Sequence, residues 1–410
     1  MSLRQDADKI IEASINAVLP DEAVKKALID REFSIGKVYL VAAGKAAWQM
    51  ARAAADIIGN RLESGIVITK YDHVKGDIEK VRCFEAGHPV PDDNSFKATE
   101  EAIKLVSNLD KEDTVVFLLS GGGSALFEKP LIDGEELADI TNQLLASGAD
   151  IVEINTIRKR LSAVKGGKFA KLCKPAHVNS IVLSDILGDP LDMIASGPAY
   201  PDSSTSEQAK NIAKKYNLKL NEKQWSLLDE ETPKELDNVE TLITGSVRNL
   251  CVAASDKCKE LGYEPLILTD MLSCEAREAG GFLSSIAVSN QDTETSKAFI
   301  AGGETVVHLT GSGKGGRNQE LSLAAAIGLH KCFDTAVFSV GSDGTDGPTD
   351  AAGGYVDENT VKKLMDKGID ITSVLSNNDA YNALKESDGL IITGATGTNV
   401  NDVSVLLIKR

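Results

Sequence analysis

Two glycine-rich turns each carry a cation where a helix is expected to begin. Lys45 follows Gly44 after the apolar run KVYLVAA, and Arg317 follows Gly316 before the apolar stretch LSLAAAIGL. The N-terminus of a helix carries partial positive charge, so a cation there costs roughly 0.3–1 kcal/mol unless an anion shares the position. Exposed N–H groups and a side-chain cation are together suited to bind phosphate. The alternative is a solvated cation that leans away from its helix.

Three consecutive glycines follow another apolar run, Val115–Leu119. Without side chains, backbone N–H groups can approach a ligand closely. The segment does not match the nucleotide-binding P-loop pattern, and a plain tight turn is the alternative. The candidates for binding substrate or phosphate are Ser120, Gly121, Gly122, Gly123 and Ser124.

Carboxylates accompany glycines after three further apolar runs. Those after Ile181–Ser184 could hold Mg²⁺ or accept a proton from a hydroxyl group, with a turn-forming role as the alternative. Those in the loop after Ala336–Val340 are suited to Mg²⁺ or to a ribose, with a solvated loop as the alternative. The candidates are Asp185, Asp189, Glu304, Asp343 and Asp346.

The densest basic patch in the chain spans residues 155–168 and includes Arg158 and Lys165. Such a patch could recruit an anionic substrate or neutralise phosphate charge. A solvated basic helix face is the ordinary alternative.

Two other patterns carry little weight. Residues 311–316 match G-x-G-x-x-G, but the acidic residue expected about 20 positions later falls roughly ten positions too late, at Asp343. The six cysteines form no C-x-x-C pair and the histidines show no metal spacing, which argues against zinc and iron–sulfur sites.

These residues lie between short apolar runs that alternate with helical stretches such as Ala46–Ile58 and Glu135–Ser147. This alternation predicts parallel sheets and an α/β fold, in which ligands bind at the carboxyl ends of strands. The expected strands are Val38–Ala43, Ile66–Thr69, Val81–Glu85, Val115–Leu119, Ile181–Ser184, Thr241–Thr244, Pro265–Thr269, Phe299–Ala301, Thr305–Thr310, Ala336–Val340 and Gly389–Thr393.

The length of 410 residues suggests two or three domains. The polar segment 227–238 is the best boundary, which predicts one domain over 1–235, a second over 236–410, and a cleft between them. The late segments look more antiparallel, and the polar turn Thr396–Asn401 between two apolar runs predicts a hairpin.

Composition excludes several classes of partner. The 44 basic and 61 acidic residues give a net charge of −17, which argues against nucleic acid. No apolar run approaches the roughly 18 residues needed to span a bilayer, so we expect no membrane partner. The N-terminal stretch reads as an amphipathic helix ending at Pro20, without the apolar core of a signal peptide. Scattered single cysteines fit a reducing compartment, so we expect a cytoplasmic protein.

Nine motifs in order along the whole chain resemble those of the glycerate 2-kinase family, also called the MOFRL family. They are AAGKAA at 42–47, GHPVPD at 87–92, SGGGSAL at 120–126, INTIRKRLSAVKGGK at 154–168, SDILGDPLDMIASGP at 184–198, GGETVV at 302–307, GGRNQE at 315–320, GSDGTDGPTDAAGG at 341–354 and TGTNVND at 396–402.

The resemblance implies transfer of the γ-phosphoryl group of ATP to D-glycerate, giving 2-phosphoglycerate, with Mg²⁺ as cofactor. It implies a Rossmann-like N-terminal domain with a mostly parallel sheet, a mixed-sheet C-terminal domain and an active site in the interdomain cleft. It also implies a role in feeding glycerate into lower glycolysis, including Entner–Doudoroff routes.

Lys45 and Arg317 match the positions usually assigned to the reacting centre of that family, and we expect Asp189 to act beside them as proton acceptor or metal ligand. The expected metal ligands are Asp185, Asp189 and Asp343. The expected nucleotide-binding residues are Glu304, Gly316, Asn318, Asp346, Thr398 and Asn399.

Two other functions stay open at this point. One is an NAD(P)H-dependent hydroxypyruvate reductase, a label carried by some relatives, and the other is a non-catalytic protein that binds organic acids. The sequence leaves the oligomeric state open, a homodimer included.

Overall fold

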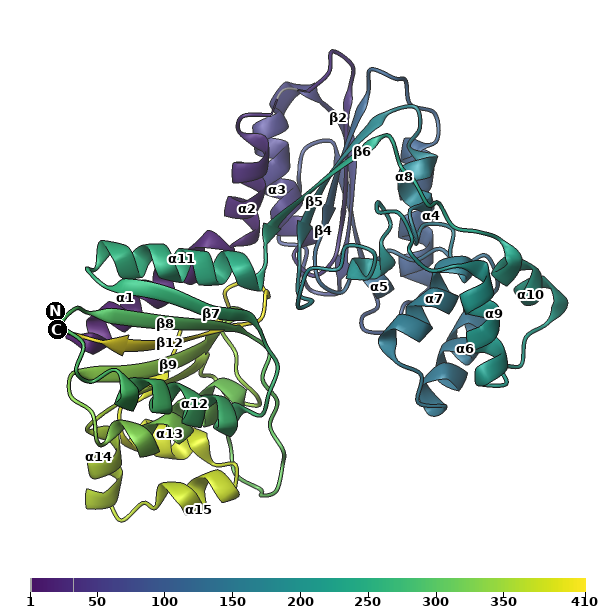
Figure 1. The fold of residues 1–410 in the computed structure, drawn as a ribbon. Coiled ribbons are helices and arrows are strands. Elements are labelled where there is room, and N and C mark those ends of the chain that lie inside the picture. Colours follow the sequence, from purple (N-terminus) through teal and green to yellow (C-terminus); the bar gives the residue numbers. More distant parts are fainter. Residues whose placement is uncertain (1, 32) are drawn as a thin grey trace. The chain divides into compact units, whose positions relative to one another are not determined.

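The chain forms two compact units, each built on its own six-stranded sheet (Figure 1). The computed structural model describes residues 2–31 and 33–410. The N-terminal unit comprises Pro20–Ser184 and Asp189–Thr244. The C-terminal unit comprises the described residues up to Leu19, then Asp185–Gly188 and Gly245–Arg410. The compact units divide after Thr244 rather than at the expected 235/236, because β6 (Val239–Gly245) completes the N-terminal sheet, and the first helix packs with the C-terminal unit.

The sheet of the N-terminal unit has the strand order β3-β2-β1-β4-β5-β6, and its first five strands are parallel neighbours. The strand order reverses between β1 and β4, and in open α/β sheets such a switch point is where ligands bind. The strands are β1 (Val38–Ala43), β2 (Leu62–Lys70), β3 (Val81–Ala86), β4 (Thr114–Leu119), β5 (His177–Leu183) and β6 (Val239–Gly245).

Helices of the N-terminal unit cover both faces of this sheet, and four of them form a separate bundle with its own apolar core (Figure 1). The bundle helices are α6 (Gly134–Ala146), α7 (Ile151–Leu161), α9 (Ser206–Lys215) and α10 (Glu222–Asp229). The others are α2 (Pro20–Leu28), α3 (Ala47–Ile58), α4 (Asp93–Val106), α5 (Gly123–Leu126) and α8 (Lys168–Leu172), with short 3₁₀ turns η1 (Gly59–Arg61) and η2 (Ile194–Ser196).

The sheet of the C-terminal unit is mixed, with the order β11-β10-β9-β12-β8-β7. Strand β12 runs antiparallel to both β8 and β9, so its first residue, Asp402, lies between the last residues of those strands, Gly303 and Gly341. The strands are β7 (Glu264–Leu272), β8 (Lys297–Gly303), β9 (Thr335–Gly341), β10 (Gly353–Asp357), β11 (Leu390–Ile391) and β12 (Asp402–Ile408). The parallel N-terminal sheet and mixed C-terminal sheet confirm the predicted fold class.

In the C-terminal unit, α1 and α11 pack on one face of the sheet, and α12 and α13 on the other (Figure 1). Buried Asp6 of α1 fixes the first helix there, because its carboxylate accepts hydrogen bonds from Tyr263 (2.8 Å) and Lys409 (2.7 Å). The helices are α1 (Leu3–Ala17), α11 (Val247–Glu260), α12 (Ala276–Ser289), α13 (Arg317–Leu329), α14 (Thr360–Asp366), α15 (Ile371–Ser376) and α16 (Ala380–Glu386).

Two strand predictions were wrong. Thr305–Thr310 lies in the loop between β8 and α13, which is held by hydrogen bonds from the backbone of Thr310 and Gly311 to the side chain of Asn378. The expected hairpin around 396–401 is absent from the described sheet, because β10 and β9 separate β11 from β12. Strand β10, with two glycines in five residues, was not foreseen.

No helix in the described part of the chain combines the length and the apolar content needed to cross a membrane.

The turn after β1 generates a stability prediction. Gly44 has φ +126°, and an added Cβ would lie 2.2 Å from the Oγ atom of Ser120. We expect Gly44→Ala to destabilise the N-terminal unit by about 2–4 kcal/mol, because strain and steric overlap add. Chemical denaturation measures this. Gly281→Ala is the control, since that helical position has open space, and equal stability of the Gly44→Ala variant and the wild type would contradict the prediction.

Candidate active site

The turn after β1 and the loop after β4 are joined by hydrogen bonds at the switch point of the N-terminal sheet. The amide of Ser120 donates to the carbonyl of Ala43 (3.0 Å), and the amide of Lys45 donates to the carbonyl of Gly121 (2.9 Å). The amide of Ala46 donates to the hydroxyl of Ser120 (3.1 Å). The structure therefore brings together Lys45 and the Ser120–Ser124 loop, as the sequence predicted.

The ammonium group of Lys45 has no internal partner. None of the residues that the structure describes forms an ion pair or hydrogen bond with it, although the residue is partly buried. Helix α3, which starts at Ala47, also lacks a side-chain cap, because its N-cap residue is Ala46. A helix start with an unpaired cation and no cap is suited to hold an external anion.

Glycine is required in the loop after β4 because other groups approach its backbone. Gly122 has φ +85°, and a Cβ there would lie 2.9 Å from Cδ2 of His88 and 3.2 Å from Cγ of Lys45. A Cβ on Gly123 would lie 2.8 Å from that of Ala195. The loop rests on three buried rings, Phe117, Phe127 and Phe169, whose centroids are 4.8–5.4 Å apart.

Arg158 and Lys165 lie behind this loop. Both donate to the carbonyl of Ser124, at 3.0 Å from Arg158 and 2.8 Å from Lys165, and each lies 3.4 Å from the buried carboxylate of Glu128. Burial lowers the pKa of Lys165 to about 8. These contacts position the loop; direct contact of the two cations with substrate stays a prediction. Sequence reasoning missed Glu128, which has no local signal.

The other cations of the basic patch make internal hydrogen bonds or ion pairs within the N-terminal unit. Lys159 pairs with the buried carboxylate of Asp202 at 2.9 Å, and Arg160 donates to the backbone and side chain of Ser204. Lys168 donates to the carbonyl of Ser162 at 2.7 Å. A solvated basic face is therefore not the explanation for these side chains.

Asp189 lies in a strained segment. Its φ is +51°, and Ala195 and Ser196 also have positive φ, at 50° and 62°. Such conformations are costly for residues other than glycine and gather at functional sites. One carboxylate oxygen of Asp189, Oδ1, is buried and has no hydrogen-bond partner among the described residues. Asp185 belongs to the C-terminal unit, where its carbonyl accepts a hydrogen bond from Asn401 at 3.2 Å.

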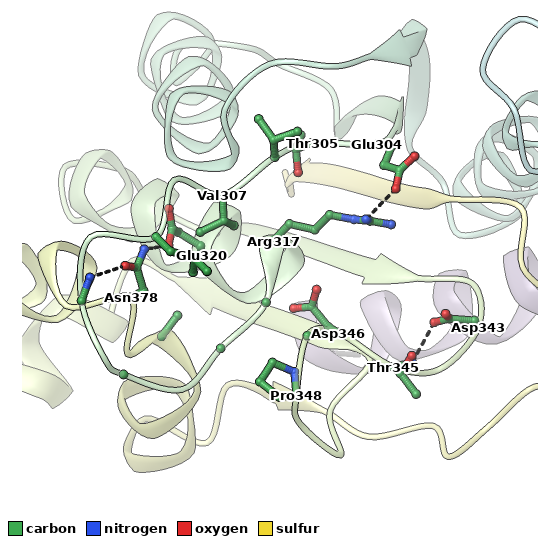
Figure 2. A pocket seen from close by; sticks show the side chains of 18 of the residues that line it. Glu304, Thr305, Val307, Arg317, Glu320, Asp343, Thr345, Asp346, Pro348 and Asn378 are labelled. Atoms are coloured by element: carbon green, nitrogen blue, oxygen red, sulfur yellow. Dashed lines mark hydrogen bonds and ion pairs between the residues drawn. The ribbon is translucent and has the colours of Figure 1, made fainter. Parts of the chain in front are cut away.

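In the C-terminal unit, Arg317 is held by two carboxylates at one edge of the sheet. Its Nε and Nη2 atoms donate to Asp402 at 2.6 and 3.1 Å, and its Nη1 donates to Glu304 at 2.8 Å (Figure 2). Burial would lower the pKa of Arg317, but the hydrogen bonds and charge of Asp402 and the charge of Glu304 outweigh it and raise the pKa. Sequence reasoning missed Asp402, the last residue of the TGTNVND motif.

The carboxylate of Asp346 caps the start of α13. Asp346 accepts hydrogen bonds from the backbone amides of Asn318 (3.1 Å) and Gln319 (2.9 Å), and from their side chains. Burial raises the pKa of Asp346 to about 6. We expected this helix start to bind an external anion. The structure corrects that expectation, because Asp346 accepts hydrogen bonds from the amides of Asn318 and Gln319, and Asp402 and Glu304 bind the guanidinium of Arg317.

A cavity of about 940 Å³ opens beside Arg317 in the C-terminal unit (Figure 2). Its walls combine apolar residues from the loop after β8 with carboxylates. Three residues expected to bind nucleotide line it: Glu304, Gly316 and Asp346. Asp343 lines it too, and its carboxylate accepts a hydrogen bond from the amide of Thr345.

Three other residues expected to bind nucleotide make internal hydrogen bonds. The side chain of buried Asn318 accepts from the hydroxyl of Ser339 at 2.5 Å, and Thr398 donates to the carbonyl of Val18 at 2.8 Å. Asn399 accepts from the amide of Asn401. Their contact with a nucleotide stays a prediction.

The glycines of the G-x-G-x-x-G match serve close packing against the protein itself. A Cβ on Gly311 or Gly313 would lie 2.4–2.5 Å from atoms of Asn377, and one on Gly316 would lie 2.3 Å from Cγ of Asp346. The weak dinucleotide signal therefore has a structural explanation.

No group of three or more His, Cys, Asp or Glu side chains in the described ranges is placed to hold a metal ion. Of the expected metal ligands, Asp185 and Asp343 belong to the C-terminal unit and Asp189 to the N-terminal unit, and their binding of a metal stays a prediction.

Comparisons with known proteins show the family of the chain. A family described as a domain of unknown function, DUF4147, matches residues 6–229, and the MOFRL family matches residues 297–402. The chain is 52% identical to a D-glycerate 2-kinase of Thermotoga maritima, and the match covers 99% of both chains. This chain belongs to the glycerate 2-kinase family.

Further relatives agree in length. The crystal structure of a glycerate kinase from Thermotoga maritima is similar to this chain with a TM-score of 0.94 and 51% identity, covering 99% of each chain. A relative from Agrobacterium vitis with the provisional name hydroxypyruvate reductase is 37% identical, over 100% of this chain and 95% of its own.

The cap on α13 can be tested by replacing Asp346 with Asn. The amide of Asn would present an N–H group to the donors of Asn318 or Gln319, so we expect a loss of about 1–3 kcal/mol in stability. Chemical denaturation at pH 8 measures it. Exposed Asp350, in the same loop, is the matched control, because its partner Tyr381 can also donate to Asn. Equal stability of Asp346→Asn and Asp350→Asn would show that the cap contributes nothing.

Proposed function

We propose that the protein is an ATP-dependent glycerate 2-kinase that transfers the γ-phosphoryl group to the 2-hydroxyl of D-glycerate with Mg²⁺. The observation that carries the proposal is the unpaired ammonium of Lys45 at an uncapped helix start, beside a glycine loop at the switch point of a parallel sheet. Phosphoryl transfer needs positioning and neutralisation of charge rather than covalent catalysis, and this arrangement supplies both.

The Lys45 site and the C-terminal cavity differ in charge, so they suit different ligands. The Lys45 site offers an ammonium, backbone N–H groups and, behind the loop, the cations of buried Lys165 and partly buried Arg158, so it suits the carboxylate of glycerate or the transferring phosphoryl group. The C-terminal cavity is lined by Arg317 and by the carboxylates of Glu304, Asp343 and Asp346, and Arg317 pairs with Glu304 and Asp402. An excess of carboxylates repels an anion that carries no metal. The same carboxylates can accept hydrogen bonds from the hydroxyl groups of a ribose and can attract a metal ion. This cavity therefore suits a nucleoside and its metal-bound phosphates.

Asp189 fits a Mg²⁺ ligand. Its buried, unpartnered Oδ1 atom lacks the hydrogen bond that a buried carboxylate oxygen normally makes. In kinases, Mg²⁺ is usually held by one or two carboxylates together with substrate phosphates, which agrees with the absence of a larger cluster in the described residues. When bound, the metal would neutralise the charge of the phosphates. The alternative role of Asp189 is to accept the proton of the attacked hydroxyl.

One pair of assays tests the proposal. The purified protein with ATP, Mg²⁺ and D-glycerate should form ADP, and ³¹P NMR should identify the product as the 2-phosphate. Oxidation of NADH with hydroxypyruvate, without ADP formation from glycerate, would overturn the kinase in favour of a reductase. Binding of glycerate with neither reaction would indicate a non-catalytic protein.

Replacing Lys45 with Ala tests the anion site. An ammonium near developing phosphoryl charge commonly contributes a few kcal/mol, so we expect kcat/KM to fall by about 10²-fold or more. Steady-state kinetics and circular dichroism measure activity and folding. Lys97→Ala, at an exposed lysine of the same unit, is the control and should retain full activity. A well-folded Lys45→Ala variant with near-normal turnover would refute the assignment.

Replacing Asp189 with Asn separates its two roles. If Asp189 holds the metal, the variant should need about tenfold or more Mg²⁺ for half-maximal activity, because Asn keeps the size but loses the charge. If it accepts the proton, kcat should fall at every Mg²⁺ concentration. A Mg²⁺ titration of the variant beside the wild type decides. Unchanged parameters would leave Asp189 as a turn residue only.

A further inference from the structure

His88 lies at the same edge of the N-terminal sheet as Lys45 and the glycine loop. It follows β3 by two residues, and the parallel alignment of β3, β2, β1 and β4 brings their carboxyl ends to one edge. Neither the expected site residues nor the proposed mechanism gives His88 a role.

The imidazole of His88 lies against Gly122. A Cβ on Gly122 would lie 2.9 Å from Cδ2 and 3.0 Å from Nε2 of His88, and 3.2 Å from Cγ of Lys45. The imidazole edge that carries Nε2 and the stem of Lys45 therefore flank the same glycine, and this glycine belongs to the loop that we propose for anion binding.

The two ring nitrogens of His88 have no internal partner. Neither forms a hydrogen bond with any residue in the described ranges, although the ring is partly buried. The neighbouring His73 differs, because its Nδ1 lies 3.2 Å from the carbonyl of Lys45. Polar groups withdrawn from water normally find a partner, so the ring of His88 is available to a ligand.

The imidazole is neutral near pH 7. Burial and the charges of Lys45 and Lys70 lower the pKa of His88 below its ordinary value of 6.5. A neutral imidazole provides one hydrogen-bond donor and one acceptor. The ammonium of Lys45 and the amides of the glycine loop can only donate, so His88 adds the acceptor that a hydroxyl proton needs.

We propose that His88 contacts the substrate directly and hydrogen-bonds a hydroxyl group of a small hydroxy acid whose anionic group is held by Lys45 and the glycine loop. The inference rests on the proposed function and makes His88 a specificity-determining residue for the acceptor. It does not concern the nucleotide.

Two substitutions separate hydrogen bonding from packing. His88→Phe keeps a ring against Gly122 but has no polar atom, whereas His88→Gln keeps a neutral donor and acceptor but loses the ring. We expect His88→Phe to raise KM for D-glycerate about tenfold or more, with KM for ATP nearly unchanged, since a lost hydrogen bond of ~1.4 kcal/mol corresponds to a factor of ten. His88→Gln should lie closer to the wild type. His177→Gln, at the opposite end of the same sheet, is the control and should match the wild type.

The outcomes are distinct. If the His88→Phe variant keeps the wild-type KM for glycerate, or has a lower KM than the His88→Gln variant, the ring only packs against Gly122. Either result overturns the inference. If the wild type itself forms no ADP with glycerate, the proposed function has failed, and NMR of the wild-type protein then decides the inference. Addition of D-glycerate should shift the imidazole ¹⁵N signals of His88, and unchanged signals would overturn direct contact.

Discussion

The hydrogen bonds that join the turn after β1 to the loop after β4 are the constraint on which the N-terminal site depends. They require two parallel neighbouring strands in register and a glycine at position 44, where a side chain would overlap Ser120. Once this junction forms, Lys45 must lie beside the glycine loop, and helix α3 must begin next to Lys45. The placement of Lys45 beside the glycine loop, on which the proposed anion site rests, therefore follows from packing of the backbone.

The same local sequence signal, a cation after glycine at a helix start, has opposite outcomes in the two units. At α13, Asp346 satisfies the N–H groups of the helix and Asp402 orients the guanidinium of Arg317. At α3, no described side chain pairs with the ammonium of Lys45, and the hydroxyl of Ser120 accepts a hydrogen bond only from the amide of the N-cap residue, Ala46. A helix start that is capped by a side chain holds its arginine in one orientation, while a helix start without such a cap leaves N–H donors for a ligand. The same local sequence signal therefore does not predict the same environment for the cation in the two units.

Much of the fold was predictable because buried parallel strands are continuously apolar and end in recognisable glycine turns. The strand Val38–Ala43 was placed with its correct bounds, and the carboxyl-edge location of Lys45 followed from it. The predictions failed where residues far away in the sequence determine the local structure. Asn378 fixes the segment 305–310 as a loop, and β10 separates two strands that looked like a hairpin. Asp402 and Glu128 were missed for the same reason, since each is defined by partners many residues away.

The charge behind the glycine loop links stability to function. Arg158 and Lys165 share the single carboxylate of Glu128, so the buried group carries a net charge of +1 when Lys165 is protonated, as a pKa of about 8 makes it at pH 7. Removing Glu128 would leave buried Lys165 and partly buried Arg158 without a carboxylate, which is destabilising, whereas a second carboxylate would cancel the charge. Both cations donate to the same carbonyl oxygen, that of Ser124, and so place their charge directly behind the glycine loop. In a protein with a net charge of −17, this group therefore gives the loop a local positive charge, as the proposed binding of an anionic substrate there requires.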